Sequence, residues 1–172
     1  MTIKKILTEP DPFLRQKSQV VEKVDDEIRR LMNDMLDTMY SAQGIGLAAI
    51  QIGVPKRIIV IDLLKEKEKK NPLYFINPEI IWSSKEDATY EEGCLSVPGQ
   101  FAEIDRPDKC HIKYLDYNGI KKELKAEGLL ATCIQHEIDH LEGILFIDYL
   151  SKLKKSLITK KLSKQKKELE RI

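Results

Sequence analysis

The spacing of apolar and polar residues along the chain predicts a mixture of helices and strands. The first helix is expected from Asp25 or Asp26, either of which can cap it, to about Ser41. Its apolar positions recur at helical spacing, so the methionines among them are expected to be core residues rather than ligands. These positions are Ile28, Leu31, Met32, Met35, Leu36 and Met39.

Other segments have the composition of β-strands and of turns. Asn118-Gly119 is the strongest hairpin signal in the chain and predicts two paired strands around it. A run of charged residues at 65–72 predicts a solvated surface loop. The expected strands are 57–62, 73–82 with an interruption at Asn77-Pro78, 111–117, 120–125, and a short apolar strand at 144–148.

Two further helices are expected in the last third of the chain. The first runs from about Gly128 to Glu142 and ends at Gly143, a residue suited to a helix C-terminus. It is apolar nearly all round, so it should be buried. Ser151 can cap the second, whose leucines at 153, 157, 162 and 169 are expected to hold it on the body along one side.

Composition limits the class of protein. A chain of 172 residues with 42% hydrophobic residues is expected to form one globular domain. Three cysteines are an odd number without a paired framework, which favours a reducing, cytoplasmic location. No signal peptide or membrane span is expected. Residues 151–172 carry a net charge of +7, and since the whole chain carries +1, the remaining 150 residues carry −6.

The sequence His136-Glu137-Ile138-Asp139-His140 predicts a metal site. Histidines four apart lie on one face of a helix, so both imidazoles can bind one ion. Glu137 lies about 100° further round the helix. From there its carboxylate can take a proton from a water on the metal and return it later, which indicates a hydrolase.

A catalytic site of this kind needs a third protein ligand. Metzincins place a histidine six residues after the second one, but Phe146 stands there. The downstream glutamates that a thermolysin-like site would use lie on the same helix or in the basic tail. The remaining histidine, His111, belongs to an expected strand. These observations leave the cysteines.

The three cysteines differ in their surroundings. Cys133 lies on the ligand face of the same helix, where three ligands would span too much length, so we interpret it as a small buried apolar residue. Cys110 precedes a strand and is interpreted as filler. Cys94 lies in a turn bounded by glycines and a proline, at 91–99, that can present a thiolate and adjacent N–H groups to a site.

Three segments together resemble the motifs of peptide deformylase, in that family's order and spacing. They are Gly44-Ile45-Gly46-Leu47-Ala48-Ala49-Ile50-Gln51, Glu92-Gly93-Cys94-Leu95-Ser96 and Gln135-His136-Glu137-Ile138-Asp139-His140. The opening Pro10-Asp11-Pro12-Phe13-Leu14-Arg15 also resembles the family. The resemblance implies removal of the formyl group from N-terminal formyl-methionine of new chains, with release of formate. It also implies the short form of the family, which ends in a C-terminal helix.

The resemblance assigns roles residue by residue. Cys94, His136 and His140 would bind one divalent ion, natively Fe²⁺, which Zn²⁺, Ni²⁺ or Co²⁺ can replace in purified protein. Glu137 would be the general base and acid, and Gln51 with the Leu95 N–H would stabilise the oxyanion. The residues implied in substrate binding are Ile45, Gly46, Gly93, Leu129 and Cys133. Asp139 is a candidate partner for a ligand imidazole.

The implied architecture is α+β, with mostly antiparallel β-sheets around the central metal-binding helix and a C-terminal helix. Residues 1–150 would form the catalytic domain, and residues 151–172 a basic helix of the same domain. The partners would be formyl-methionyl nascent peptides and, through that helix, the ribosome, with no membrane or specific DNA.

Some features leave alternatives open. Gly44-x-Gly46-x-x-Ala49 formally matches a dinucleotide fingerprint, but it follows a helix instead of a strand. Phe101 stands where some relatives of the resembled family carry Arg, which puts any substrate contact of that Arg in doubt. The other hypotheses are a metallopeptidase built on the same helix, and an RNA-binding or ribosome-binding module with a structural metal.

Overall fold

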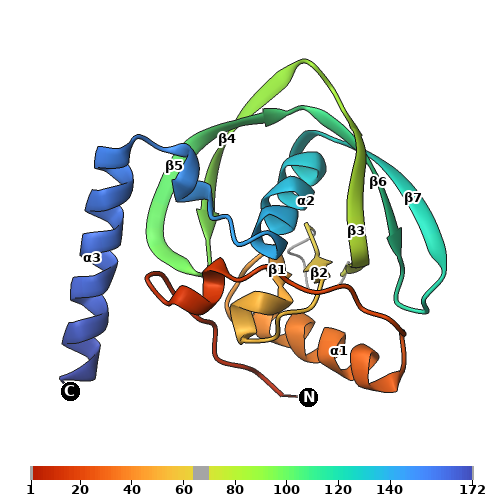
Figure 1. Cartoon of the computed structure of the whole chain (residues 1–172), viewed down its shortest axis with the longest axis horizontal. Helices are drawn as coiled ribbons and strands as arrows, with labels where there is room; N and C mark the ends of the chain where they lie inside the picture. Colours follow the sequence, from red (N-terminus) through yellow and green to blue (C-terminus); the bar gives the residue numbers. More distant parts are fainter. Residues whose placement is uncertain (1, 64–69, 172) are drawn as a thin grey trace.

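A five-stranded antiparallel sheet forms the body of the molecule, in the strand order β1-β2-β3-β6-β7 (Figure 1). The structure is a computed structural model that describes residues 2–63 and 70–171. Residues 65–69 of the expected charged loop therefore lie outside the described residues. The strands are β1 (Gly46–Ala48), β2 (Ile58–Ile61), β3 (Leu73–Ser83), β6 (Lys109–Leu115) and β7 (Lys121–Glu127).

Strand β2 is covered on both faces, which explains its continuous apolar sequence. Ile58 and Val60 pack in one cluster with the methionines of α1 (Asp26–Ser41). Ile59 and Ile61 point the other way and pack with residues of α2 (Gly128–Leu141). Successive side chains of a strand point to opposite faces, so both helices bury part of β2. The methionine stripe is therefore core, as predicted.

The ends of α1 and α2 agree with the sequence signals. The Asp25 carboxylate accepts a hydrogen bond from Ile28 N at 3.0 Å, so it caps α1 as expected. Gly143 follows α2 with φ of 76°, a left-handed conformation that favours glycine. Figure 1 shows α2 in the middle of the molecule, with strands on both sides of it.

The two strands of a second sheet were not predicted, and the turn expected at 91–99 is confined to the two residues between them. Strands β4 (Asp87–Cys94) and β5 (Val97–Pro107) are antiparallel and joined by Leu95 and Ser96. The buried residues Val97 and Ile104 of β5 pack with Phe146. This hairpin brings Cys94 to the end of a strand beside α2.

Two strand predictions are confirmed with changed details. Strands β6 and β7 do form a hairpin, but its loop spans Asp116 to Ile120. The loop is longer than Asn118-Gly119 because the Asp116 carboxylate accepts hydrogen bonds from two loop N–H groups, those of Asn118 at 2.9 Å and Ile120 at 3.0 Å. The expected break at Asn77-Pro78 is an irregularity inside β3, with φ of 53° at Asn77 and a register shift.

The prediction of a strand at 144–148 is wrong. Phe146–Tyr149 forms a short 3-10 helix, η3, in which Asp148 accepts a hydrogen bond from Leu145 N at 3.1 Å. This local bond supports a turn, and the apolar residues are buried by packing on β5 instead of by strand pairing. Two similar short helices, η1 (Pro12–Arg15) and η2 (Ala49–Ile52), occur earlier in the chain.

The last helix, α3 (Lys152–Glu170), is capped by Ser151 as predicted, but its leucine side is largely exposed. Leu153, Leu157 and Leu169 are 70%, 58% and 73% exposed, so the predicted stripe does not hold the helix. Leu162 is buried and packs with Ile158 in the cluster of β5 and η3. Figure 1 shows α3 along one side of the molecule.

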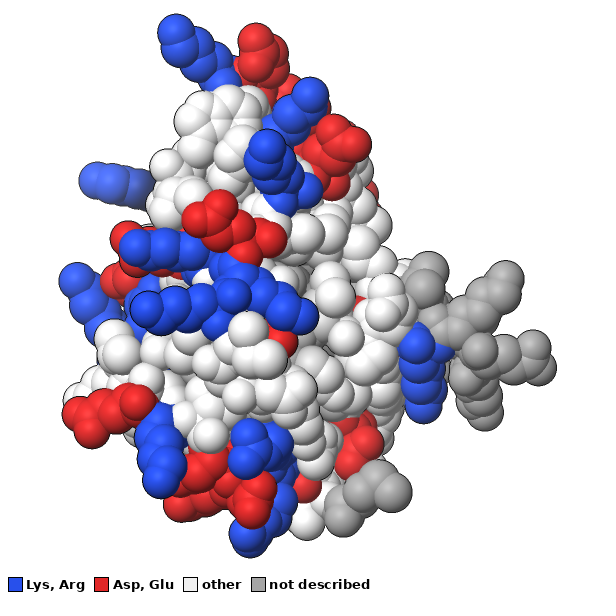
Figure 2. All heavy atoms as spheres, turned by 90° about the vertical axis from the view of Figure 1, so that its right-hand side faces the viewer, with Lys and Arg blue, Asp and Glu red and all other residues white. Residues whose placement is uncertain are grey.

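Charges of both signs are interspersed on the opposite face. Figure 2 shows Lys and Arg side chains next to Asp and Glu side chains there. Lys122 pairs with Asp116 at 3.0 Å, and Lys113 with Glu79 at 3.5 Å. Within the described residues, no helix has the length and apolar character needed to cross a membrane.

Candidate metal centre and active site

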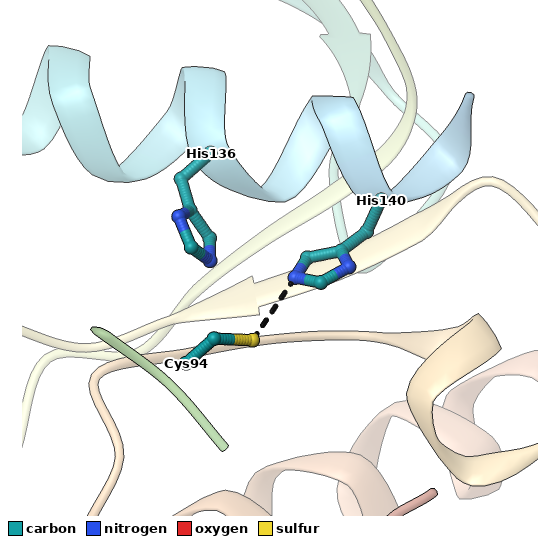
Figure 3. A group of neighbouring side chains, drawn as sticks. All are labelled: Cys94, His136 and His140. Carbon is teal, nitrogen blue, oxygen red and sulfur yellow. Dashed lines mark hydrogen bonds between the residues drawn. The ribbon is translucent and has the colours of Figure 1, made fainter. Parts of the chain in front are cut away.

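Helix α2 presents two imidazoles on one face. His136 and His140 are one turn apart, and their ring centroids are separated by 5.1 Å. Both rings point from the helix towards Cys94 (Figure 3). His140 is 1% exposed and His136 is 8% exposed, so both are removed from bulk water.

Cys94 reaches the same point from the end of β4. Its Sγ lies 3.3 Å from His140 Nε2. One donor atom each from Cys94, His136 and His140 lie within 4.8 Å of one another. These are the three residues for which the sequence predicted the ligand role.

The donor set fits a divalent transition metal. A thiolate and two imidazoles suit Zn²⁺ or Fe²⁺, and three protein ligands leave a position open for water or substrate. Burial lowers the pKa of His140 well below its usual value, which favours the neutral imidazole that binds a metal. Burial alone would also lower the pKa of His136, but hydrogen bonds with Cys94 and Glu92 outweigh it and raise that pKa, so an ion that binds there would displace a proton. Buried side chains with these donor atoms need partners, and an ion at their centre would satisfy them.

A buried ion pair supports the ring of His136. Its Nδ1 is 2.8 Å from Glu92 Oε1, and Arg106 binds Glu92 through two contacts of 2.6 and 3.0 Å. Burial alone would raise the pKa of Glu92, but hydrogen bonds from His136 and Arg106 outweigh it and lower that pKa. Glu92 therefore fixes the orientation of the ring as a carboxylate.

The sequence did not identify Glu92 as this partner, although it carries a signal for it. Glu92 lies two residues before Cys94 on β4, and residues two apart in a strand share a face. Asp139, the predicted candidate, instead accepts hydrogen bonds from Arg106 at 2.8 Å and from Tyr149 at 2.7 Å. Asp139 thus reaches His136 indirectly, through Arg106 and Glu92.

Glu137 lies buried between the helix and β1. It is 4% exposed, and burial raises the pKa of its carboxyl to about 7. A methyl group on Gly46 would lie 2.5 Å from Glu137 Oε2. The absence of a side chain at Gly46 therefore leaves the space that this carboxylate occupies.

Gln51 lies on η2, where its amide group contacts two other segments. Its Oε1 accepts a hydrogen bond from Ala48 N at 2.9 Å. Its Nε2 donates to Ser96 Oγ at 2.9 Å and is 3.5 Å from Cys94 Sγ. The residue is 1% exposed, so these contacts are shielded from water.

A cavity of about 570 Å³ opens onto this group of residues. Such a volume suits a small ligand or a short peptide segment. Its wall includes Cys94, Leu95, His136, Glu137 and Phe101. All five residues predicted to bind substrate line it as well: Ile45, Gly46, Gly93, Leu129 and Cys133.

The other two cysteines lie outside the ligand group. Cys110 is fully buried, and burial raises the pKa of its thiol to about 11. Cys133 belongs to the core cluster around α2 and is also part of the cavity wall. Both placements agree with the interpretation of these residues as apolar filler.

Known proteins are similar to this chain in both sequence and fold. A family model described as polypeptide deformylase matches residues 3–156. The peptide deformylase of Pelagibacter ubique (strain HTCC1062) is 70% identical over 168 residues, which cover 96% of each chain. That of Phenylobacterium zucineum (strain HLK1) is 61% identical over 167 residues, covering 97% of this chain and 99% of the relative.

Solved structures of peptide deformylases are also similar to this one. The peptide deformylase from Ehrlichia chaffeensis in complex with actinonin has a TM-score of 0.92 and 48% identity, covering 96% of this chain and 98% of that one. A peptide deformylase from Legionella pneumophila has a TM-score of 0.91 and 47% identity, covering 99% of both chains.

Proposed function

The chain belongs to the peptide deformylase family, metal-dependent hydrolases that remove the N-formyl group from newly made polypeptides, and we propose that Cys94, His136 and His140 hold its ion. The observation that carries this proposal is the convergence of these three donor atoms within 4.8 Å, at a cavity that Glu137 also lines. We propose Fe²⁺ as the native ion, with Zn²⁺, Ni²⁺ or Co²⁺ as substitutes, since thiolate and imidazole ligands suit such ions. A bound ion of this class lowers the pKa of a water and polarises a carbonyl group.

Glu137 is the proposed general base and general acid. Its carboxylate takes the proton from the attacking water and delivers it to the departing amine. The burial that raises its pKa to about 7 suits both steps, because a group with a pKa near the working pH exchanges protons readily.

Gln51 and the Leu95 N–H are the proposed donors to the oxyanion. Nε2 of Gln51 lies 3.5 Å from Cys94 Sγ, so it is next to the proposed ion site. Leu95 follows Cys94 directly in the turn and lines the cavity. Donors fixed before the reaction stabilise the developing charge without reorganising.

The formyl-methionyl peptide is proposed to bind along β1. This strand is at the edge of the five-stranded sheet, so Ile45 and Gly46 can pair with an extended peptide as an added strand. The methionine side chain would then enter the cavity and contact the part of its wall formed by Leu129 and Cys133 of α2. Gly93 of β4 also lines this cavity and is proposed to contact the peptide through its backbone, since the Phe101 ring occupies the space that a side chain at this position would need.

The basic helix α3 is proposed to dock the enzyme near new chains at the ribosome. Residues 151–172 carry +7, and lysines bind RNA phosphates without sequence preference. Its contact with β5 and η3 through Leu162 supports assignment of 151–172 to the same domain as residues 1–150. Unpaired cysteines and a nascent substrate support a cytoplasmic location.

Formate release from a formyl-Met peptide by anaerobically prepared protein tests this function. The wild type should release formate, and its metal content should be near one ion per chain. Glu137→Ala should lose turnover by roughly 10²–10⁴-fold but keep its metal, because it removes the proton carrier without removing a ligand. Loss of metal, or near-normal turnover, in Glu137→Ala would show that its assigned role is wrong.

A further inference from the structure

The amide group of Gln51 is held at both ends by hydrogen bonds. Ala48 N donates to Oε1 at 2.9 Å, and Nε2 donates to Ser96 Oγ at 2.9 Å. The first contact fixes which end is the oxygen, because a flipped amide would place two N–H donors against each other. The second contact occupies one of the two N–H groups of Nε2 and so fixes where the other one points, which is towards Cys94 and the proposed ion site.

Ser96 is well placed to hold this group. It is fully buried, and its own N–H lies 3.4 Å from Cys94 Sγ. Its backbone is fixed as well, because Glu9 N donates to Ser96 O at 2.8 Å. Two residues earlier, Leu7 N donates to Gln51 O at 2.7 Å. The N-terminal segment thus joins the backbones of Gln51 and Ser96, whose side chains also meet.

We propose that Ser96 is a positioning residue that fixes the amide of Gln51 and, with it, the pair of N–H groups directed at the Cys94 sulfur. Ser96 contributes its backbone N–H at 3.4 Å, and Gln51 contributes Nε2 at 3.5 Å. Hydrogen bonds to a ligand sulfur withdraw electron density from it and so tune the bound ion. The Ser96 hydroxyl therefore acts on the site through Gln51, without contact with the substrate.

The inference rests on the proposed roles of Gln51 and Cys94, so the experiment tests the positioning role of Ser96 separately from those roles. Gln51→Ala, Ser96→Ala and the double variant are compared for kcat and KM on a formyl-Met peptide. Gln51→Ala should lower kcat by about 10²–10³-fold, the usual cost of one oxyanion donor. Ser96→Ala should lower kcat by roughly tenfold with little change in KM, because it misdirects that donor without removing it. The double variant should equal Gln51→Ala.

The variants also have a spectroscopic readout. In cobalt-loaded protein, loss of a hydrogen bond to sulfur raises the energy of its lone pairs, so the thiolate-to-metal charge-transfer band moves to longer wavelength. Ser96→Ala and Gln51→Ala should both shift the band in this direction. Ser18→Ala is a matched control, since this serine is also buried but its hydroxyl has no hydrogen-bond partner among the described residues. It should change neither kcat nor the band.

Two outcomes would overturn the positioning role. One is a Ser96→Ala variant whose kcat and charge-transfer band are unchanged. The other is a Ser96→Ala substitution that lowers kcat by the same factor in the wild type and in the Gln51→Ala variant. Full activity in Gln51→Ala would instead overturn the role of Gln51 itself. If Ser96→Ala does not fold, the zinc-loaded wild type still tests the contact by NMR. The Gln51 side-chain amide protons should exchange slowly with solvent, and exchange as fast as at a surface glutamine would contradict the proposal.

Discussion

At the scale of single residues, the position of the Glu137 carboxylate depends on the space that Gly46 leaves. Gly46→Ala would place a methyl group 2.5 Å from Glu137 Oε2 and 3.2 Å from Cys133 Sγ. The end of a flexible side chain can move away, so the protein should fold and bind metal. The carboxylate would be displaced, however, and a displacement of about 1 Å costs on the order of 100-fold in rate. We expect kcat to fall by about that factor, measured by formate release.

Metal content and melting temperature are the controls for Gly46→Ala. Both should remain near wild type if the loss comes from the position of Glu137. Unchanged kcat, or a loss of metal in parallel with activity, would contradict this explanation.

The sequence predicted single residues best where local spacing carries the information. The positions of His136 and His140 follow from one helical turn, and their side chains do converge on Cys94. Their role as ligands stays a prediction. Arg106 could not be predicted in the same way, because its contacts with Glu92 and Asp139 join positions 14 and 33 residues away. Such pairs become neighbours through the β4–β5 hairpin, which local spacing did not reveal.

The same distinction applies to the structural elements. Helix α1 was predicted nearly to its ends because its apolar spacing and its cap at Asp25 are local. Strands β4 and β5 were missed because their outer positions are charged and their stability comes from pairing with each other and packing on η3. The segment 144–148 was assigned as a strand because short apolar runs do not distinguish a strand from a buried turn.

The junction after α2 depends on Gly143. Its φ is 76°, and an added methyl group would collide with the backbone oxygen of Arg15 in η1. Gly143→Ala should therefore destabilise the protein by about 1–2 kcal/mol for the left-handed conformation. A further roughly 1–3 kcal/mol should come from displacement of η1. Urea unfolding measures the free-energy change.

Gly53→Ala is the matched control for the junction. Gly53 has a similar φ of 84°, but nothing lies within 4 Å of an added methyl group. It should therefore show the conformational cost without the collision. Equal losses in the two variants would mean that contact with η1 contributes nothing.

At the scale of the whole molecule, Asp148 connects the two ends of the chain. Its carboxylate contacts Arg15 at 2.6 Å and Lys155 of α3 at 2.8 Å. Burial alone would raise the pKa of Asp148, but hydrogen bonds from Lys155, Arg15 and Leu145 N outweigh it and lower that pKa. Its contribution to stability is therefore fully present above the ordinary value of 3.8 and is lost as the pH falls through the lower folded pKa.

Asp148→Asn should accordingly be less stable than wild type at pH 6, and this difference should disappear in acid. Urea unfolding at both pH values measures it. Asp26→Asn is the control, because the Asp26 side chain is 82% exposed and its pair with Arg29 should contribute little. A destabilisation by Asp148→Asn that does not change with pH would contradict the assigned ionic role.

The proposed ribosome docking also belongs to this scale. Since Leu162 is buried against the body, a truncation of α3 that removes Leu162 would disturb the core, and charge changes are the better test. Glutamine replaces five exposed lysines, at positions 160, 161, 164, 166 and 167. Co-sedimentation with ribosomes should weaken and depend less on salt, while activity on short formyl peptides stays near wild type. Unchanged ribosome binding at low salt would remove the docking role.

The composition of the metal's ligand shell tests the central claim most directly. X-ray absorption of the metal-loaded protein should detect one sulfur at about 2.3 Å and two imidazole nitrogens at about 2.0–2.1 Å. Cys94→Ser should lose the sulfur, and Cys133→Ser, which changes the other cysteine of the cavity wall, should keep it. A wild-type shell without sulfur, or a sulfur that disappears in Cys133→Ser and persists in Cys94→Ser, would contradict the assignment of Cys94, His136 and His140 as the metal ligands.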